Sequence, residues 1–144
     1  MHQTSITATA SSLRGPERRV IALLRAWHAG EAHQAAAWKD LCKSLGVARA
    51  RGCLRAFEEM LALMDRHGWR CLTILPETAE GWSEDELSVA RFVMAATEQQ
   101  RDVALSEAAF LVRPSALLPL LTTASRFGLP LLCEDCRARV MGRA

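Results

Sequence analysis

The longest helical pattern of the sequence lies in residues 45–68, and it limits what the chain can fold into. Apolar side chains recur there every three or four residues, so they line one face of a helix while charged side chains line the other. The apolar positions are Leu54, Phe57, Leu61 and Met64, and the charged positions are Arg51, Arg55, Glu59 and Arg66. A helix of this kind buries its apolar face against other helices. We therefore expect a helical domain organised around this helix.

Prolines and glycines predict where the first helices begin and end. Pro16 favours the start of a helix that runs to about residue 29, because proline is tolerated in a first helical turn. Gly46 predicts the end of a second helix, over 33–45, before the long one begins. Gly52 lies inside the long helix, where glycine costs about 1 kcal/mol relative to alanine. Either a neighbouring backbone passes close to Gly52, or the regular helix begins after it.

Helix signals also fill the second half of the chain. Ser83 and Glu86 have the spacing of a capping box, in which each side chain bonds to the backbone of the other residue. The apolar pattern that follows is interrupted by the polar residues 98–102, which favours two helices with a turn over one long helix. Pro114 then predicts the start of a further helix and Gly128 its end.

Residues 69–75, WRCLTIL, are the one segment with the composition of a β-strand, since aromatic and β-branched residues are enriched there. A strand needs a partner for its backbone groups, and the other extended apolar candidate is 129–133. The sequence therefore predicts a mostly α fold. We expect a five- or six-helix single-domain bundle with at most one short β-hairpin or strand pair, around 69–75 and 129–133.

The length and composition indicate one globular domain. The chain has 144 residues, of which 50% are hydrophobic and 24% charged. Its polar, Ser/Thr-rich start predicts a disordered segment over 1–13, followed by a single helical domain over 14–144. No apolar run approaches the roughly 20 residues that cross a bilayer, so we expect a cytoplasmic protein with no membrane contact. Five cysteines without a secretory signal are expected to stay reduced.

Basic residues are concentrated in the first half of the chain. Residues 1–72 hold 11 Arg and Lys against 6 Asp and Glu, whereas residues 73–132 hold 4 against 8. The 47–67 helix follows a shorter helix and a Leu-Gly turn, which is compatible with a helix-turn-helix whose second helix reads DNA. Its candidate contacts to phosphates and guanine edges are Arg49, Arg51 and Arg55. The charge difference is equally compatible with two halves of the protein that attract each other.

Cys133 and Cys136 form a CxxC motif, the one spacing in the sequence with metal or redox character. Two thiolates two residues apart hold one side of a tetrahedral zinc ion, and a structural site needs four ligands. Cys71 and His67 would complete the set if the two predicted strands pair. The motif is also compatible with a redox function, although the intervening carboxylates disfavour a thiolate, or with no function.

The sequence gives no positive support for catalysis, because it contains no Gly-rich phosphate loop and no HExxH motif. No cofactor is expected other than possible zinc. Leucines crowd residues 117–132 more densely than one side of a short helix buries, and such a surplus often forms a self-association surface. A helix that is buried on all sides gives the same pattern.

We therefore expect a non-catalytic interaction or regulatory module that acts as a homodimer or with a protein partner. The first alternative is a helix-turn-helix DNA-binding regulator that uses the 47–67 helix. The second is a small zinc-binding protein that uses the CxxC motif.

Overall fold

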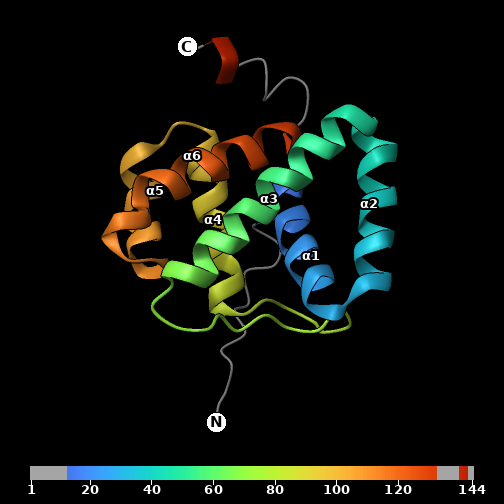
Figure 1. Cartoon of the computed structure of the whole chain (residues 1–144), viewed down its shortest axis with the longest axis horizontal. Helices are drawn as coiled ribbons and strands as arrows, with labels where there is room; N and C mark the ends of the chain where they lie inside the picture. Colours follow the sequence, from blue (N-terminus) through green and yellow to red (C-terminus); the bar gives the residue numbers. More distant parts are fainter. Residues whose placement is uncertain (1–12, 133–139, 143–144) are drawn as a thin grey trace.

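The computed structural model describes residues 13–132 and 140–142, and they form a bundle of helices (Figure 1). The α-helices are α1 (Gly15–Ala29), α2 (Glu31–Leu45), α3 (Val47–His67), α4 (Glu84–Thr97), α5 (Arg101–Leu111) and α6 (Leu117–Gly128), and the 3-10 helices are η2 (Pro114–Ala116) and η3 (Leu129–Leu131). Residues 140–142 are also helical. The mostly α fold is confirmed, and so is the turn that divides α4 from α5. Of the predicted disordered segment 1–13, residues 1–12 lie outside the described residues.

Helix α4, rather than α3, lies at the centre of the bundle. It packs against α1, α5 and α6, whereas α3 packs against α6 and α2 and crosses the front of the bundle in Figure 1. Every residue from 92 to 97 is buried. The sequence pattern misidentified the central helix because α4 begins with three acidic residues, which are typical of a solvated helix end. Asp85 and Glu86 are instead buried.

The buried face of α3 is rotated from the predicted one. Leu54 and Leu61 are only half-buried, and small residues occupy the centre of the interface in their place. The buried residues of α3 are Ala50, Cys53, Ala56, Phe57, Met60 and Met64. The Phe57 ring contacts Trp27 edge-on at 5.3 Å and Phe127 at 4.9 Å between ring centroids. Such aromatic pairs contribute about 0.5–1.5 kcal/mol each beyond area burial, so Phe57 ties α3 to α1 and α6.

The strand pair that the sequence allowed, around 69–75 and 129–133, does not form among the described residues. The part of the chain that the structure describes contains an isolated bridge between Gly68 and Val112, but residues 69–75 pair with no strand. The predicted partner segment is the 3-10 helix η3 as far as Leu131, and residue 133 lies outside the described residues. Pro130 explains the helix, because proline fits a first helical turn and has no N–H for a β-ladder.

The end of α6 is pressed against α4. A Cβ atom at Gly128 would overlap the hydroxyl of Thr97, which donates a hydrogen bond to the Val93 carbonyl at 2.7 Å. The two helices therefore approach closely only because residue 128 has no side chain. None of the helices within residues 13–132 and 140–142 has the length and hydropathy of a membrane span.

Candidate functional site

A buried ion pair joins α1 to the first turn of α4. Arg25 donates from Nε to Glu86 Oε2 at 2.7 Å and from Nη2 to Glu86 Oε1 at 2.8 Å. The Glu86 side chain has no solvent exposure. Arg25 also donates to the carbonyls of Ala79 and Gly81, at 3.3 and 2.8 Å. A planar guanidinium matched to a carboxylate at two points is the strongest form of such a pair, and here it also fixes the loop before α4.

The chain between α3 and α4, residues 69–83, is held by side chains rather than by a β-ladder. The backbone N–H of Thr73 donates to Asp85 at 2.6 Å, and that of Leu75 donates to Glu86 at 3.0 Å. The Ser83 hydroxyl caps α4 and donates to the Thr73 carbonyl at 2.6 Å. Backbone groups near the core must find partners, so these two carboxylates and one hydroxyl replace the strand that the sequence predicts.

Asp85 is ionised in this arrangement. Its side chain accepts two hydrogen bonds from the Arg70 guanidinium, at 2.6 and 2.9 Å. This pairing, together with the bond from the Thr73 backbone, lowers the pKa of the Asp85 carboxyl below its ordinary value, although partial burial opposes the shift. The charges at the start of α4 are thus satisfied within the chain, which marks them as structural groups.

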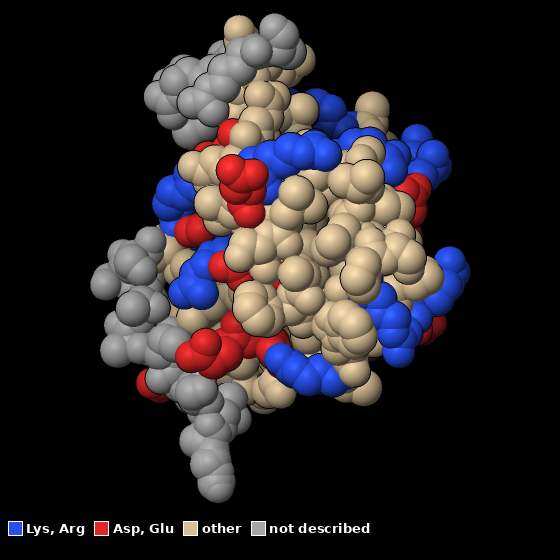
Figure 2. Space-filling view, turned by 90° about the vertical axis from the view of Figure 1, so that its left-hand side faces the viewer, with Lys and Arg blue, Asp and Glu red and all other residues tan. Residues whose placement is uncertain are grey.

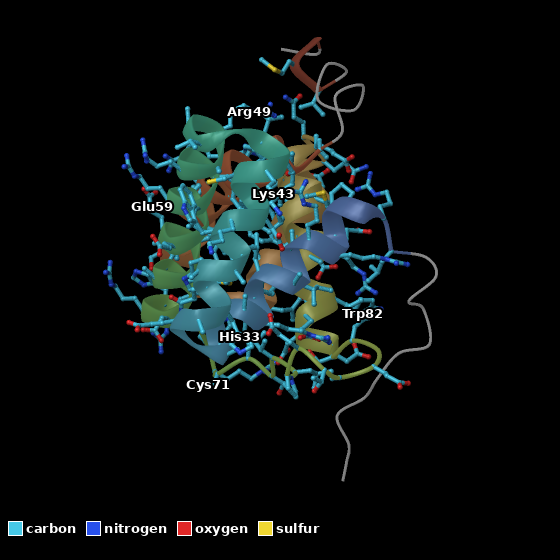
Figure 3. All side chains as sticks on the ribbon, turned by 90° about the vertical axis from the view of Figure 1, so that its right-hand side faces the viewer. His33, Lys43, Arg49, Glu59, Cys71 and Trp82 are labelled. Atoms are coloured by element: carbon cyan, nitrogen blue, oxygen red, sulfur yellow. The ribbon has the colours of Figure 1, made fainter. Side chains whose placement is uncertain are left out.

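A cavity of about 430 Å³ lies between the 69–83 segment and the C-terminal half of α3. Figure 3 shows the segment crossing the base of the molecule from Cys71 toward Trp82. The cavity walls are apolar, with Leu24, Met64 and Ile74 among them, and the volume is in the range of ligand pockets. Its polar lining residues, such as Asp65, are exposed to solvent, so no buried polar group converges on a ligand there.

The structure tests only part of the predicted metal set. Cys71 is exposed in the 69–83 segment and His67 is half-buried at the end of α3. Cys133 and Cys136 lie outside the described residues. Within the residues that the structure covers, no group of three or more His, Cys, Asp and Glu side chains is arranged to hold a metal ion, so the zinc site stays a prediction. Cys53 is a different kind of thiol, because burial raises its pKa to about 12.

The predicted DNA contacts all belong to the N-terminal half of α3. At 100° per residue, Arg51 and Arg55 share one side of the helix, and Arg49 lies about 120–160° round the helix from them. Arg49, Arg51 and Arg55 are all exposed, and the first turn of α3 has no acidic residue. Figure 3 shows Arg49 at the end of the molecule opposite the 69–83 segment, and Lys43, which belongs to the last turn of α2, farther down on the same half. These four side chains are called the basic corner below. The connection between α2 and α3 is Gly46 alone, whereas a DNA-binding helix-turn-helix has a turn of three or four residues.

Gly52 lies on the exposed side of α3 beside the basic corner. Neither expectation from the sequence holds for it, because α3 is regular from Val47 onward and no atom lies within 4 Å of the position of a Cβ on Gly52. Nothing within the described fold explains a glycine at this position.

The outer surface of α5 carries large apolar side chains that sequence reasoning did not single out. Phe110 is 74% exposed and Val103 is 50% exposed. Figure 2 views the side of the molecule on which α5 lies and shows a continuous area of side chains other than Lys, Arg, Asp and Glu, with basic and acidic groups along its border. The exposed Arg101 lies to one side of α5, and at 100° per residue the other five exposed residues of the helix fall within an arc of about 120°. We call these residues the α5 face: Asp102, Val103, Ser106, Ala109 and Phe110, which are all exposed.

Trp69 and Arg113 extend the α5 face at its C-terminal end. The Trp69 indole N–H donates to the Ala109 carbonyl at 3.0 Å, and the Trp69 side chain remains 53% exposed. The Arg113 guanidinium lies 5.6 Å from the centre of the Trp69 ring, in a cation–π contact. The opposite side of α5 is buried at Ala104 and Ala108. The exposed apolar groups therefore belong to one surface. The helix predicted after the polar residues 98–102 has its apolar pattern over 103–112, and a count of outward positions on it was the signal that could have revealed this surface.

Comparisons of this chain with protein-family models, with curated proteins and with solved structures find no significant match. Function is therefore argued from the α5 face and the basic corner themselves.

Proposed function

We propose that the chain is a non-catalytic interaction or regulatory module that works by binding another protein surface through the α5 face. The observation that carries the proposal is the 74% exposure of Phe110. Burial of a phenylalanine in the core stabilises a fold by roughly 1.5–3 kcal/mol. Phe110 does not contribute this stabilisation to the fold, because most of its surface is exposed. A partner that covers the face would recover it.

The neighbours of Phe110 strengthen this reading. Val103 lies seven residues earlier, two helical turns away on the same side, and Trp69 lies beside Ala109 at the C-terminal end. Exposed apolar residues that occur singly are ordinary on soluble proteins, whereas contiguous ones mark binding surfaces. Aromatic residues are also enriched at the centres of such surfaces.

Light scattering over a range of protein concentrations tests the proposal. We expect the mass of the wild-type protein to rise with concentration, and Phe110→Asp to remain a monomer at every concentration. Val47→Asp is the matched control, because Val47 is also about half exposed, at 53%, but belongs to the start of α3. Equal association of the Phe110→Asp and wild-type proteins would refute the use of this face.

A second candidate function, binding of duplex DNA or a similar polyanion, is favoured by the basic corner. The N-terminus of a helix carries partial positive charge, so cations there are unfavourable and anions favourable. α3 nevertheless has Arg49 and Arg51 near its start and no acidic residue in its first turn. An arrangement that opposes the helix dipole becomes favourable when a phosphate backbone lies against it.

Fluorescence anisotropy with a labelled DNA duplex tests this candidate. We expect binding at low salt that weakens steeply as salt is added, because each neutralised phosphate releases counterions. Replacing Arg49, Arg51 and Arg55 by alanine should abolish it. Arg66→Ala removes an exposed charge from the other end of the same helix and should change binding little. An affinity that does not depend on salt would rule the candidate out.

A further inference from the structure

We infer that the partner of the α5 face is a second copy of the same chain, with the two α5 helices antiparallel across a two-fold axis. This inference rests on the proposed function and identifies the partner. It follows from the order of side chains along the α5 face, which is complementary to its own reverse.

The side chains of the α5 face lie along two edges of the helix surface. Val103 and Phe110 lie on one edge of the α5 face, and Asp102 and Ala109 lie on the other edge, with Ser106 between them. Arg113 follows the helix and lies over the Trp69 ring beside Ala109. One edge is therefore apolar at both ends, and the other has an acid at its N-terminal end and a base at its C-terminal end.

A two-fold axis that relates two antiparallel α5 helices passes between them, beside α5 and level with residues 106 and 107. This axis reverses the direction of the partner helix. The edge with Val103 and Phe110 still faces the same edge of the copy, and so does the edge with Asp102 and Ala109. Val103 of one copy then meets Phe110 of the other, twice, and Asp102 meets Arg113, twice. Ser106 lies at the axis, where its small side chain lets the helices approach closely. Reciprocal contacts of this kind define a two-fold symmetric interface.

Charge distinguishes this arrangement from its alternative. A parallel pair would bring the two Asp102 carboxylates to one end and the two Arg113 guanidinium groups to the other, and like charges at an interface are costly. In the antiparallel pair both charges find opposite partners. Neither side chain has an ion-pair partner elsewhere in residues 13–132 or 140–142, so both are available for a contact between copies.

The reason to choose a second copy over an unrelated partner is that the face specifies its own complement. A surface that fits the α5 face needs a base opposite Asp102, an acid opposite Arg113 and apolar groups opposite Phe110 and Val103. The α5 face, reversed, has all of these at the required positions.

Charge reversal tests the inference by sedimentation velocity. Asp102→Arg and Arg113→Asp should each weaken self-association about tenfold, which corresponds to about 1.4 kcal/mol, because every Asp102–Arg113 contact becomes repulsive. An equimolar mixture of the two variants should associate as strongly as the wild type, since both contacts between unlike chains are attractive again. The double variant Asp102→Arg/Arg113→Asp should also associate normally. Thermal unfolding of each variant at low concentration shows that it is folded.

The outcomes separate this inference from the proposed function. Recovery in the mixture and in the double variant supports the antiparallel dimer. If Phe110→Asp abolishes association but the mixture does not recover, the face binds in another register and this inference alone fails. A wild-type protein that stays monomeric at high concentration overturns the dimer, and with it the expected self-association through the α5 face.

Discussion

At the start of α4 two carboxylates are buried, whereas on α5, which packs directly against α4, a phenylalanine is 74% exposed. Both regions place side chains in the environment that usually excludes them. The carboxylates of Asp85 and Glu86 find every partner they need within the chain: arginines from α1 and from the 69–83 segment, and backbone N–H groups. No part of the chain that the structure describes covers Phe110 and Val103 in a comparable way.

The difference indicates where the function lies. The cost of burying the Asp85 and Glu86 carboxylates is offset by their hydrogen bonds within the chain. We therefore interpret this cluster at the start of α4 as structural and call it the clamp. The exposure of apolar side chains to water is unfavourable, and within the described fold nothing removes it. Binding of a partner would remove it. The four predictions below test this division, beginning with the largest expected effect.

Breaking the clamp should have the largest effect on stability. Glu86→Ala leaves the buried Arg25 guanidinium and the N–H groups of Leu75 and Ser83 without their acceptor. Removal of one partner from a buried ion pair typically costs about 3–5 kcal/mol, and we expect a loss of that size in urea denaturation. Glu84→Ala is the matched control: Glu84 belongs to the same helical turn but is exposed. That variant should lose less than about 1 kcal/mol, the contribution of an acid to the helix dipole.

The second prediction concerns pH. Asp85 has a pKa below its ordinary value in the folded protein, so its ionised form stabilises the fold at neutral pH. This contribution is present above the unfolded pKa of about 3.9 and is lost as pH falls through the lower folded pKa. Asp85→Asn should cost about 1–2 kcal/mol at pH 7, toward the low end for charged hydrogen bonds because Arg70 is exposed.

The same variant should lose part of the acid sensitivity of the wild type. The stability difference between the Asp85→Asn and wild-type proteins should be constant above about pH 5 and should shrink as the pH falls through the lowered folded pKa of Asp85, by the linkage of protonation to folding. Chemical denaturation at a series of pH values measures it. A difference that does not change with pH would show that the Asp85 charge has no part in the clamp.

These two regions also show what the sequence could and could not predict. The helices followed from periodicity, proline and glycine, because those signals act within a few residues. The capping box of Ser83 and Glu86 was predicted for the same reason, and it forms. The partner of Glu86 was not predictable, because Arg25 lies 61 residues away in the chain and only the packing of α1 on α4 brings them together.

The error about residues 69–75 has a related cause. The composition of a strand is a preference for extended backbone, and residues 69–75 form neither a helix nor a β-ladder. A local sequence pattern does not show which groups accept the hydrogen bonds of the backbone N–H groups. Here the acceptors are side chains of Asp85 and Glu86. The α5 face was missed because helix 103–112 was read only for its apolar content, not for the side of the helix on which each residue lies.

The third prediction concerns the exposed glycine of α3. Gly52→Ala should stabilise the protein by about 1 kcal/mol, because alanine favours the helix and nothing surrounds the new methyl group. Gly128→Ala should instead destabilise it by about 1–3 kcal/mol, the usual effect of overpacking, since its Cβ would overlap the Thr97 hydroxyl. Thermal unfolding of both variants checks the signs. If Gly52→Ala also weakens DNA binding, the glycine serves the basic corner as Phe110 is proposed to serve the α5 face.

The fourth prediction compares a phenylalanine on the α5 face with one in the core, and it includes the smallest expected change in monomer stability. Phe110→Ala should alter the free energy of unfolding by less than about 0.5 kcal/mol at low protein concentration, as exposed substitutions usually do. Phe57→Ala removes the same ring from the core, where Phe57 is fully buried, and should cost about 3–5 kcal/mol.

Concentration then shows whether the exposed ring is used. Binding that is specific to the folded state raises the midpoint of unfolding as concentration increases, so the wild-type midpoint should rise while that of Phe110→Ala stays constant. At high concentration the two proteins should therefore differ although their monomers are equally stable. Midpoints that coincide at every concentration would mean that Phe110 is an ordinary surface residue, and the contrast between the clamp and the α5 face would lose its functional meaning.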